Sequence, residues 1–298
     1  MRTKDNVTAP SRVTGGLLLG ALGVLAFSFS LPATRLAVAG LDPWFVAFGR
    51  AVGAGVLATV YLLVTSARRP TAGQLRRLVV VALGVVVGFP LCTSLALTEQ
   101  TASHGAVVIT MLPAVTAVFG VLRGGERPSR AFWLAAGASF VAVLAFVGVS
   151  GGFGGGFQLA DLWLLVAVLA CGLGYAEGGA LARDLGGART ICWALVLSLP
   201  VSLAITVVVV AGHGFAGATG SSWLGFAYVT VISMFLGFFA WYAGLARGGV
   251  ARIGQVQALQ PVLTLTWSAL LLHEQVSLVT VLVALVVLGC VVLTQRAR

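Results

Sequence analysis

Charged residues are scarce in this sequence of 298 residues. They make up 9% of the chain, whereas hydrophobic residues make up 59%. A soluble globular domain carries about 25% charged residues, so this composition excludes a chain that folds in water. A bilayer core about 30 Å thick needs roughly 20 apolar residues per helix, and the sequence contains many runs of that length. The solvent for most of this chain is therefore lipid.

Residues for catalysis and metal binding are also few. The chain has eight Asp and Glu residues and three His residues, scattered rather than clustered as an enzyme acting on lipid-linked substrates would need. Its four cysteines lie inside apolar runs at spacings that match no zinc or redox motif, so we expect four small buried side chains. No GxxxxGK[ST] nucleotide-binding loop occurs. The sequence predicts no cofactor, no metal and no enzymatic activity.

The net charge of +10 does not indicate nucleic-acid binding. The basic residues are spread out, not gathered in a dense patch with interleaved aromatic residues. With the N-terminus placed inside, every basic residue except Arg35 and Arg50 falls in the terminal segments or loops of the inner side. Cytoplasmic loops keep such an excess of Lys and Arg. This predicts both termini in the cytoplasm, and the preference for arginine over lysine indicates a bacterial cell membrane.

Ten apolar runs predict an all-α, multi-pass membrane protein. The spans must be helices, because backbone groups in lipid can bond only within the protein. Residues 1–12 are polar, and we expect them to be disordered. The predicted spans are 13–33, 43–65, 77–97, 102–122, 130–149, 159–182, 189–211, 222–246, 251–272 and 276–294.

One stretch of the sequence occurs twice. Pro113 is followed 13 residues later by Glu126, and Pro261 is followed at the same distance by Glu274. Both pairs are 148 residues apart, and the same offset relates Arg35 to Arg183, Leu97 to Leu245 and Thr116 to Thr264. A fixed period of this kind indicates an internal repeat.

The repeat and the helix count together predict the architecture. Residues 13–149 and 159–294 each hold five predicted helices. Because five is odd, the second half enters the membrane from the opposite side, and the two halves are inverted. Inverted repeats are common in secondary transporters, which bind substrate near the midplane between the halves. The pattern therefore favours alternating access over a passive pore.

These motifs resemble the EamA family of the drug/metabolite transporter superfamily. Gly-Gly-Glu126-Arg-Pro is similar to that family's loop after the fourth helix, and Phe48-Gly-Arg50 is similar to its second-helix arginine. The second half departs from the pattern, with Glu274 between His and Gln. The resemblance covers nearly the whole chain and implies export or exchange of small metabolites, often amino acids, through a central cavity. A lipid flippase, proton coupling, and a monomer or homodimer all remain open.

Two charges within the spans are candidate site residues, since an ionisable side chain inside a bilayer is costly and usually faces a cavity or a partner. We expect Arg50 to hold a substrate carboxylate through its planar fork, or else to bond helix carbonyls or reach the membrane surface. We expect Glu177 to bind a proton or a substrate amine, or else to reach Arg183 or Arg189 at the inner surface. By helix rise the two lie in opposite leaflets, so no salt bridge between them is expected.

The other candidates are uncharged. Gln257 and Gln260 precede Pro261, which frees a backbone carbonyl one turn earlier, so they could line a cavity or bond neighbouring helices. Tyr175, Trp241 and Tyr242 could form walls of a ligand site, or a belt at the membrane interface.

Three titratable residues near predicted helix ends could have a purely structural role. We interpret Glu126 and Glu274 as caps on the positive ends of the fifth and tenth helices and as hinges. His104 could sense pH, or could be an ordinary surface histidine.

Overall fold

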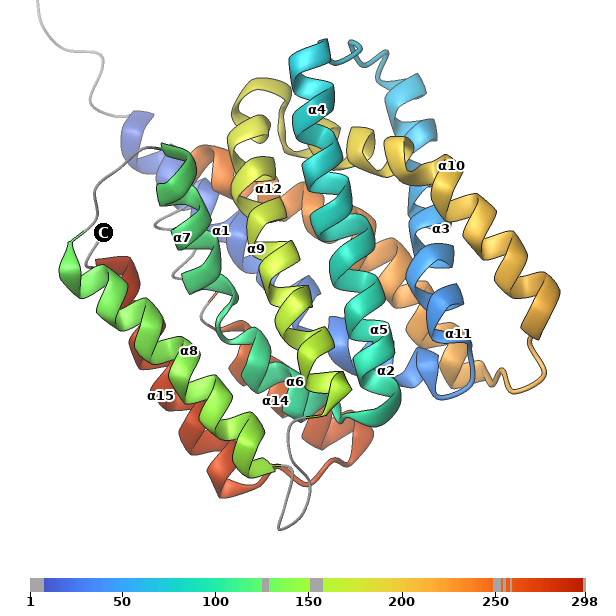
Figure 1. Ribbon diagram of the computed structural model, residues 1–298. Helices are drawn as coiled ribbons and strands as arrows, with labels where there is room; N and C mark the ends of the chain where they lie inside the picture. Colours follow the sequence, from blue (N-terminus) through green and yellow to red (C-terminus); the bar gives the residue numbers. More distant parts are fainter. Residues whose placement is uncertain are drawn as a thin grey trace, which may run out of the picture.

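The computed structural model describes residues 8–124, 129–150, 158–248, 253, 256–257 and 259–296. These residues form helices joined by short connections, with no β-strand among them (Figure 1). Glu126 and Gln255, a third glutamine shortly before Pro261, lie outside the described residues. The first half of the chain contains α1 Thr8–Ser28, α2 Ser30–Val38, α3 Pro43–Val64, α4 Ala72–Val81, the π-helical segment η1 Ala82–Gly88, α5 Phe89–Glu99, α6 Ala102–Ile109, α7 Leu112–Gly124 and α8 Arg130–Ser150.

The second half is built from similar pieces. Its helices are α9 Leu159–Leu185, α10 Gly187–His213, α11 Gly220–Ala227, the π-helical segment η2 Tyr228–Leu236, α12 Gly237–Gly248, α14 Gln260–Leu272 and α15 Leu278–Arg296.

Seven helical stretches among the described residues are long and apolar enough to cross a membrane, and three further apolar helices are shorter. The expectation of disorder over residues 1–12 is wrong in part, since α1 begins at Thr8. Pro10 does not prevent this start, because proline is tolerated in the first turn of a helix.

Local capping explains where several helices begin. Asp42 accepts hydrogen bonds from the N–H groups of Trp44 and Phe45 at the start of α3. Thr71 and Gln74 form a reciprocal capping box at the start of α4. Such side chains satisfy the N–H groups that the first turn of a helix leaves without partners. The box explains why α4 begins before the predicted boundary at residue 77.

The break between α1 and α2 is held by contacts from α14. Ser28 is the last residue of α1, and its carbonyl accepts a hydrogen bond of 2.8 Å from the Thr264 hydroxyl. Its own hydroxyl accepts one of 3.0 Å from the indole of Trp267. The ring of Phe29, at the break, stacks on Trp267 with centroids 4.3 Å apart. A neighbouring helix thus satisfies the groups freed by the interruption, as lipid could not.

The irregular positions recur along the chain. η1 covers residues 82–88 and η2 covers residues 228–236, at nearly the same 148-residue spacing as the repeated motifs. Helix α7 begins at Leu112 and α14 begins at Gln260, and these starts are 148 residues apart. Helix breaks and π segments often occur at functional sites. These interrupted segments are therefore candidates for the functional site.

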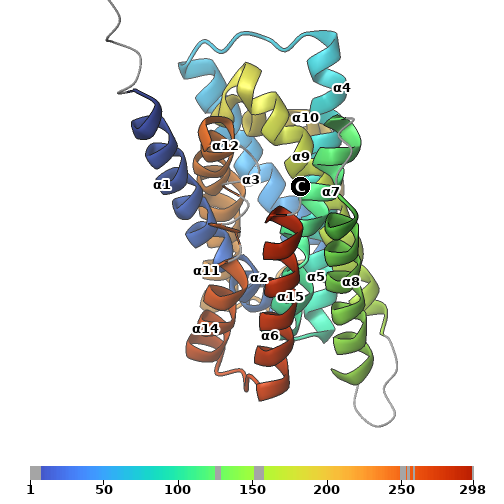
Figure 2. The same ribbon diagram turned by 90° about the vertical axis from the view of Figure 1, so that its left-hand side faces the viewer.

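The packing places α9 inside the bundle and pairs other helices along its edges. Helix α9 contacts α4, η1, α5 and α7, while α1 packs along α12 and α3 along α10. Helices α8 and α15 form a further pair at one side (Figures 1 and 2). Large apolar side chains face outward from these edges, as Val64, Leu134 and Val208 do. In a membrane protein such a surface faces lipid chains rather than water.

Candidate functional site

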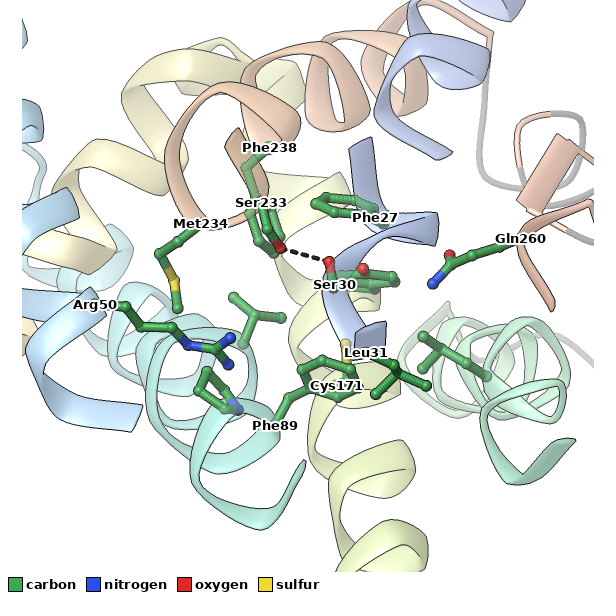
Figure 3. A pocket seen from close by; sticks show the side chains of 14 residues that line it. Phe27, Ser30, Leu31, Arg50, Phe89, Cys171, Ser233, Met234, Phe238 and Gln260 are labelled. Atoms are coloured by element: carbon green, nitrogen blue, oxygen red, sulfur yellow. Dashed lines mark hydrogen bonds between the residues drawn. The ribbon is translucent and has the colours of Figure 1, made fainter. Parts of the chain in front are cut away.

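A central cavity lies where the interrupted helices meet (Figure 3). The cavity is narrow, with a volume of about 20 Å³. Segments from both halves of the chain contribute to its wall, namely α1, α2, α3, η1, α5, α7, α9, η2, α12 and α14. Ligand pockets usually measure roughly 300–1,000 Å³, so this cavity must widen before a small molecule can enter it.

Arg50 extends into the cavity from α3, with its guanidinium group directed toward the middle (Figure 3). The residue is only 2% exposed, and its Nε atom has no hydrogen-bond partner among the described residues. Neither structural alternative fits, because the side chain does not reach the surface and no carbonyl of the described residues accepts its Nε–H. A buried charge without a partner is costly. Its position thus suits a group that binds an anion.

Two helix N-termini face the same space. Leu112, the first residue of α7, and Gln260, the first residue of α14, both line the cavity. Pro113 and Pro261 each lie second in their helix, where a missing N–H costs little. The first turn of a helix offers N–H groups and the positive end of the helix dipole. The two half-helices therefore add to the positive potential around Arg50.

Polar side chains opposite Arg50 complete the cavity wall. Gln260 enters from the side opposite Arg50 (Figure 3), and its Oε1 atom has no partner among the described residues. Ser30 and Ser233 share a hydrogen bond of 2.6 Å, which joins α2 to η2. Gln257 is also buried, with an Nε2 atom that has no partner in the described part of the chain, but it does not line the cavity.

The aromatic candidates occupy two different positions. Tyr175 lines the cavity, whereas Trp241 and Tyr242 are buried behind it. Ring centroids of Tyr175 and Trp241 are 5.5 Å apart, and Phe238 lies 5.3 Å from Tyr242. The alternative of an interfacial belt is wrong for all three, because each is at most 4% exposed within the bundle. They form an aromatic support for the cavity wall.

Glu177 lies apart from Arg50 and forms ion pairs with Arg77 and Arg123. Its carboxylate is fully buried, with one oxygen toward each arginine. The alternative in which Glu177 reaches Arg183 or Arg189 is wrong, because its partners come from α4 and α7. Each oxygen already faces an arginine, which makes a substrate amine a poor ligand for this residue.

Glu274 caps a helix, but not the one expected. Its two oxygens accept hydrogen bonds of 2.9 and 2.8 Å from the N–H groups of Ala102 and Ser103, at the start of α6. The tenth predicted helix, α15, is instead capped by Ser277, whose hydroxyl accepts from the N–H of Thr280. The helix start nearest in sequence was thus the wrong one.

His104 is not an ordinary surface residue. Its side chain is 11% exposed, and its Nε2 atom lies 2.7 Å from the carboxylate of Asp161, at the start of α9. This contact ties α6 to α9 near the cap that Glu274 provides. The alternative of an ordinary surface histidine is therefore wrong.

Several residues of the site had no clear signal in the sequence. Ser30 and Ser233 are small hydroxyl residues within apolar runs, where they resemble ordinary packing residues. Arg77 and Arg123 counted only as part of the inner positive charge. In the part of the chain that the structure describes, no three His, Cys, Asp or Glu side chains come together as a metal site would need.

Comparisons with known proteins identify relatives of the whole chain. A profile of the EamA-like transporter family matches residues 14–148 and again residues 158–295. The chain is 46% identical over 294 residues to a protein of Bacillus subtilis (strain 168) described as the uncharacterized transporter YdeK, covering 96% of this chain and 99% of that protein. A protein of known crystal structure matches with a TM-score of 0.64 and 18% identity, over 94% of this chain and 96% of its own. At that identity the structural match concerns the fold alone.

Proposed function

We propose, from the premise that the chain belongs to the EamA-like transporter family, that it exports or exchanges small metabolites that carry a carboxylate. Amino acids and related compounds fit this description. The observation that carries the proposal is Arg50, a buried arginine in the central cavity whose Nε atom has no protein partner among the described residues. A substrate carboxylate would supply the missing acceptor in a geometry that matches the guanidinium fork.

The proposed mechanism is alternating access between two inverted halves, residues 13–149 and 159–294, with ten membrane-spanning helices and both termini in the cytoplasm. Three observations support it. The family profile matches twice, the starts of α7 and α14 are 148 residues apart, and both halves line the cavity. A site between inverted halves can open to either side if the halves exchange their arrangements.

Counterflow in proteoliposomes tests the proposal. The vesicles are loaded with a mixture of amino acids and other small metabolites, and exchanged compounds are identified by mass spectrometry. We expect one or a few carboxylate-bearing compounds to exchange saturably. Flux without saturation or counterflow would indicate a passive pore instead. No exchange by folded protein would exclude the compounds in the mixture and favour lipidic cargo moved by a flippase.

Arg50→Ala links the flux to the cavity. Loss of hydrogen bonds to a charged group typically costs about 1.5–3 kcal/mol, so we expect KM for the exchanged compound to rise about tenfold to hundredfold. Arg50→Lys keeps the charge without the fork and should retain part of the affinity. Arg189→Ala removes an exposed arginine outside the cavity and is the matched control. An unchanged KM in Arg50→Ala would remove Arg50 from the binding site.

A further inference from the structure

Two helices that line the cavity, α7 and α9, are joined by an ion triad to α4, which leads directly into the η1 segment of the cavity wall. Glu177 of α9 is fully buried, and its two carboxylate oxygens pair with Arg77 of α4 and Arg123 of α7. The two arginine side chains are 34% and 45% exposed. The carboxylate is therefore enclosed, while the cations that hold it remain accessible from one end of the bundle.

The triad lies between the cavity and the end of the bundle that we propose to be cytoplasmic. Glu177 is two residues beyond Tyr175, which lines the cavity. Arg77 precedes Val85 of the cavity wall by eight residues, about 12 Å along a helix at 1.5 Å per residue. Arg123 lies at the far end of α7, which begins at the cavity with Leu112. When the three side chains are paired, α4, α7 and α9 are held together below the cavity.

The charges of the triad do not balance. Two guanidinium groups share one carboxylate, so the cluster keeps one excess positive charge even when it is closed. Arginine binds carboxylates through paired, charge-assisted hydrogen bonds. A carboxylate arriving from the cytoplasm would thus meet both an attractive potential and the same two guanidinium groups that now pair with Glu177.

We propose that Arg77 and Arg123 form a second carboxylate site on the transport path, at its cytoplasmic end. Glu177 occupies this site when the path is closed, and the carboxylate of a substrate occupies it when the path opens. The inference rests on the proposed transport of carboxylate-bearing compounds and adds to it the place where such a compound first binds from inside. A ligand shifts an equilibrium only when it binds one state more tightly than the other. In the open state the two arginines are separated from Glu177, so they bind a substrate carboxylate more tightly than they do in the closed state.

Cys171 provides a reporter that does not depend on knowing the substrate. It lines the cavity and is 1% exposed, so a thiol reagent reaches it only when the path opens. The experiment uses the full chain with Cys92, Cys192 and Cys290 changed to alanine. The protein is reconstituted in vesicles, and a membrane-impermeant maleimide is added to one side at a time. The measured quantity is the rate of Cys171 labelling from each side.

Glu177→Gln should speed labelling from the cytoplasmic side by about fivefold or more, the size of a typical coupling between two states. Asp184→Asn changes an exposed carboxylate on the same helix and should leave the rate unchanged. If Glu177→Gln does not fold, Arg77→Gln and Arg123→Gln carry the same test, because both arginines are partly exposed and tolerate substitution better. An unchanged cytoplasmic rate in a folded variant would overturn the gating role.

Acetate tests the binding site itself. Added on the cytoplasmic side at equal ionic strength with chloride as the reference, it should speed Cys171 labelling in the parent protein. The effect should vanish when both Arg77 and Arg123 are changed to glutamine. If acetate has no effect in the parent, the two arginines are not a carboxylate site. These rates need no transported compound, so a failure of counterflow would refute the proposed function and leave the labelling result standing on its own.

Discussion

At the scale of single residues, the carboxylate of Glu274 connects parts of the chain that are 172 residues apart. It accepts hydrogen bonds from the N–H groups of Ala102 and Ser103, the first two residues of α6. These N–H groups have no carbonyl partner within their own helix, and they carry the positive end of its dipole. Glu274 therefore holds the start of α6, whose continuation α7 begins at the cavity.

We expect Glu274→Gln to lower the stability of the folded protein. Glutamine keeps the size and one acceptor of glutamate but loses the charge, so the loss should be about 1–2 kcal/mol, as for other helix caps. The measurement is the unfolding midpoint in detergent by a thermal-shift assay, which should fall by a few degrees. Glu99→Gln, at an exposed carboxylate near the end of α5, is the control and should melt like the parent. A parental midpoint for Glu274→Gln would mean that the charge of this cap is dispensable.

The sequence identified unusual charges but not their partners. Arg50 and Glu177 stood out because charges inside apolar runs are rare. The contacts of Glu177 and Glu274, however, cross 100 and 172 residues of sequence. Which arginine or helix start meets a carboxylate depends on how the helices pack, and hydropathy carries no information about that packing. The partners considered from the sequence were near neighbours along the chain: Arg183 or Arg189 for Glu177, and the start of the tenth helix for Glu274.

At the scale of helices, the sequence predicted those helix boundaries that depend on nearby residues. The span predicted over 43–65 is observed as α3 Pro43–Val64, and that over 130–149 as α8 Arg130–Ser150. Pro113 and Pro261 mark the breaks before α7 and α14, because a proline inside an apolar run interrupts the helix on its N-terminal side. The π segments and the break at Phe29 had no local signal, because they depend on neighbouring helices. At Phe29, for example, the support comes from Thr264 and Trp267.

Close packing between α3 and η2 leads to a prediction about this pair of elements. Gly53 lies so near η2 that a Cβ atom added to it would be 2.7 Å from Cγ2 of Thr230. Gly53→Ala should therefore destabilise the protein by about 1–3 kcal/mol through overpacking. Thr230→Ser removes the methyl group that would collide, while the hydroxyl can still bond the carbonyl of Phe226 as it does now. The double variant should recover most of the lost stability.

A double-mutant cycle measures this coupling. The unfolding midpoints of the parent, both single variants and the double variant give the interaction between the two positions. Gly73→Ala is the matched control, since nothing lies within 4 Å of a Cβ atom added there. Additive effects at Gly53 and Thr230 would show that α3 and η2 are not in the close contact described here.

At the scale of the whole molecule, the helices pair as the proposed inverted repeat would require. At an offset of 148 residues, α9 matches α1, while η2 and α12 match η1 and α5. Helix α1 packs along α12, and α9 packs along η1 and α5. The pairs α3 with α10 and α8 with α15 each join a helix to its own counterpart. The equal spacing of motifs predicted two related halves. The choice of neighbours was not predictable, because each helix presents apolar residues on several faces.

The inverted arrangement makes a prediction about sidedness. Thr65 and His213 are 148 residues apart, each exposed where a helix ends, at α3 and at α10. Figure 1 places the connections that follow these helices at opposite ends of the bundle. In a variant with the four native cysteines changed to alanine, Thr65→Cys should react with an impermeant thiol reagent only from the cytoplasmic side. His213→Cys should react only from the outside, because an odd number of crossings separates the two positions. Reaction of both from one side would refute the inverted repeat, and with it the physical basis for alternating access.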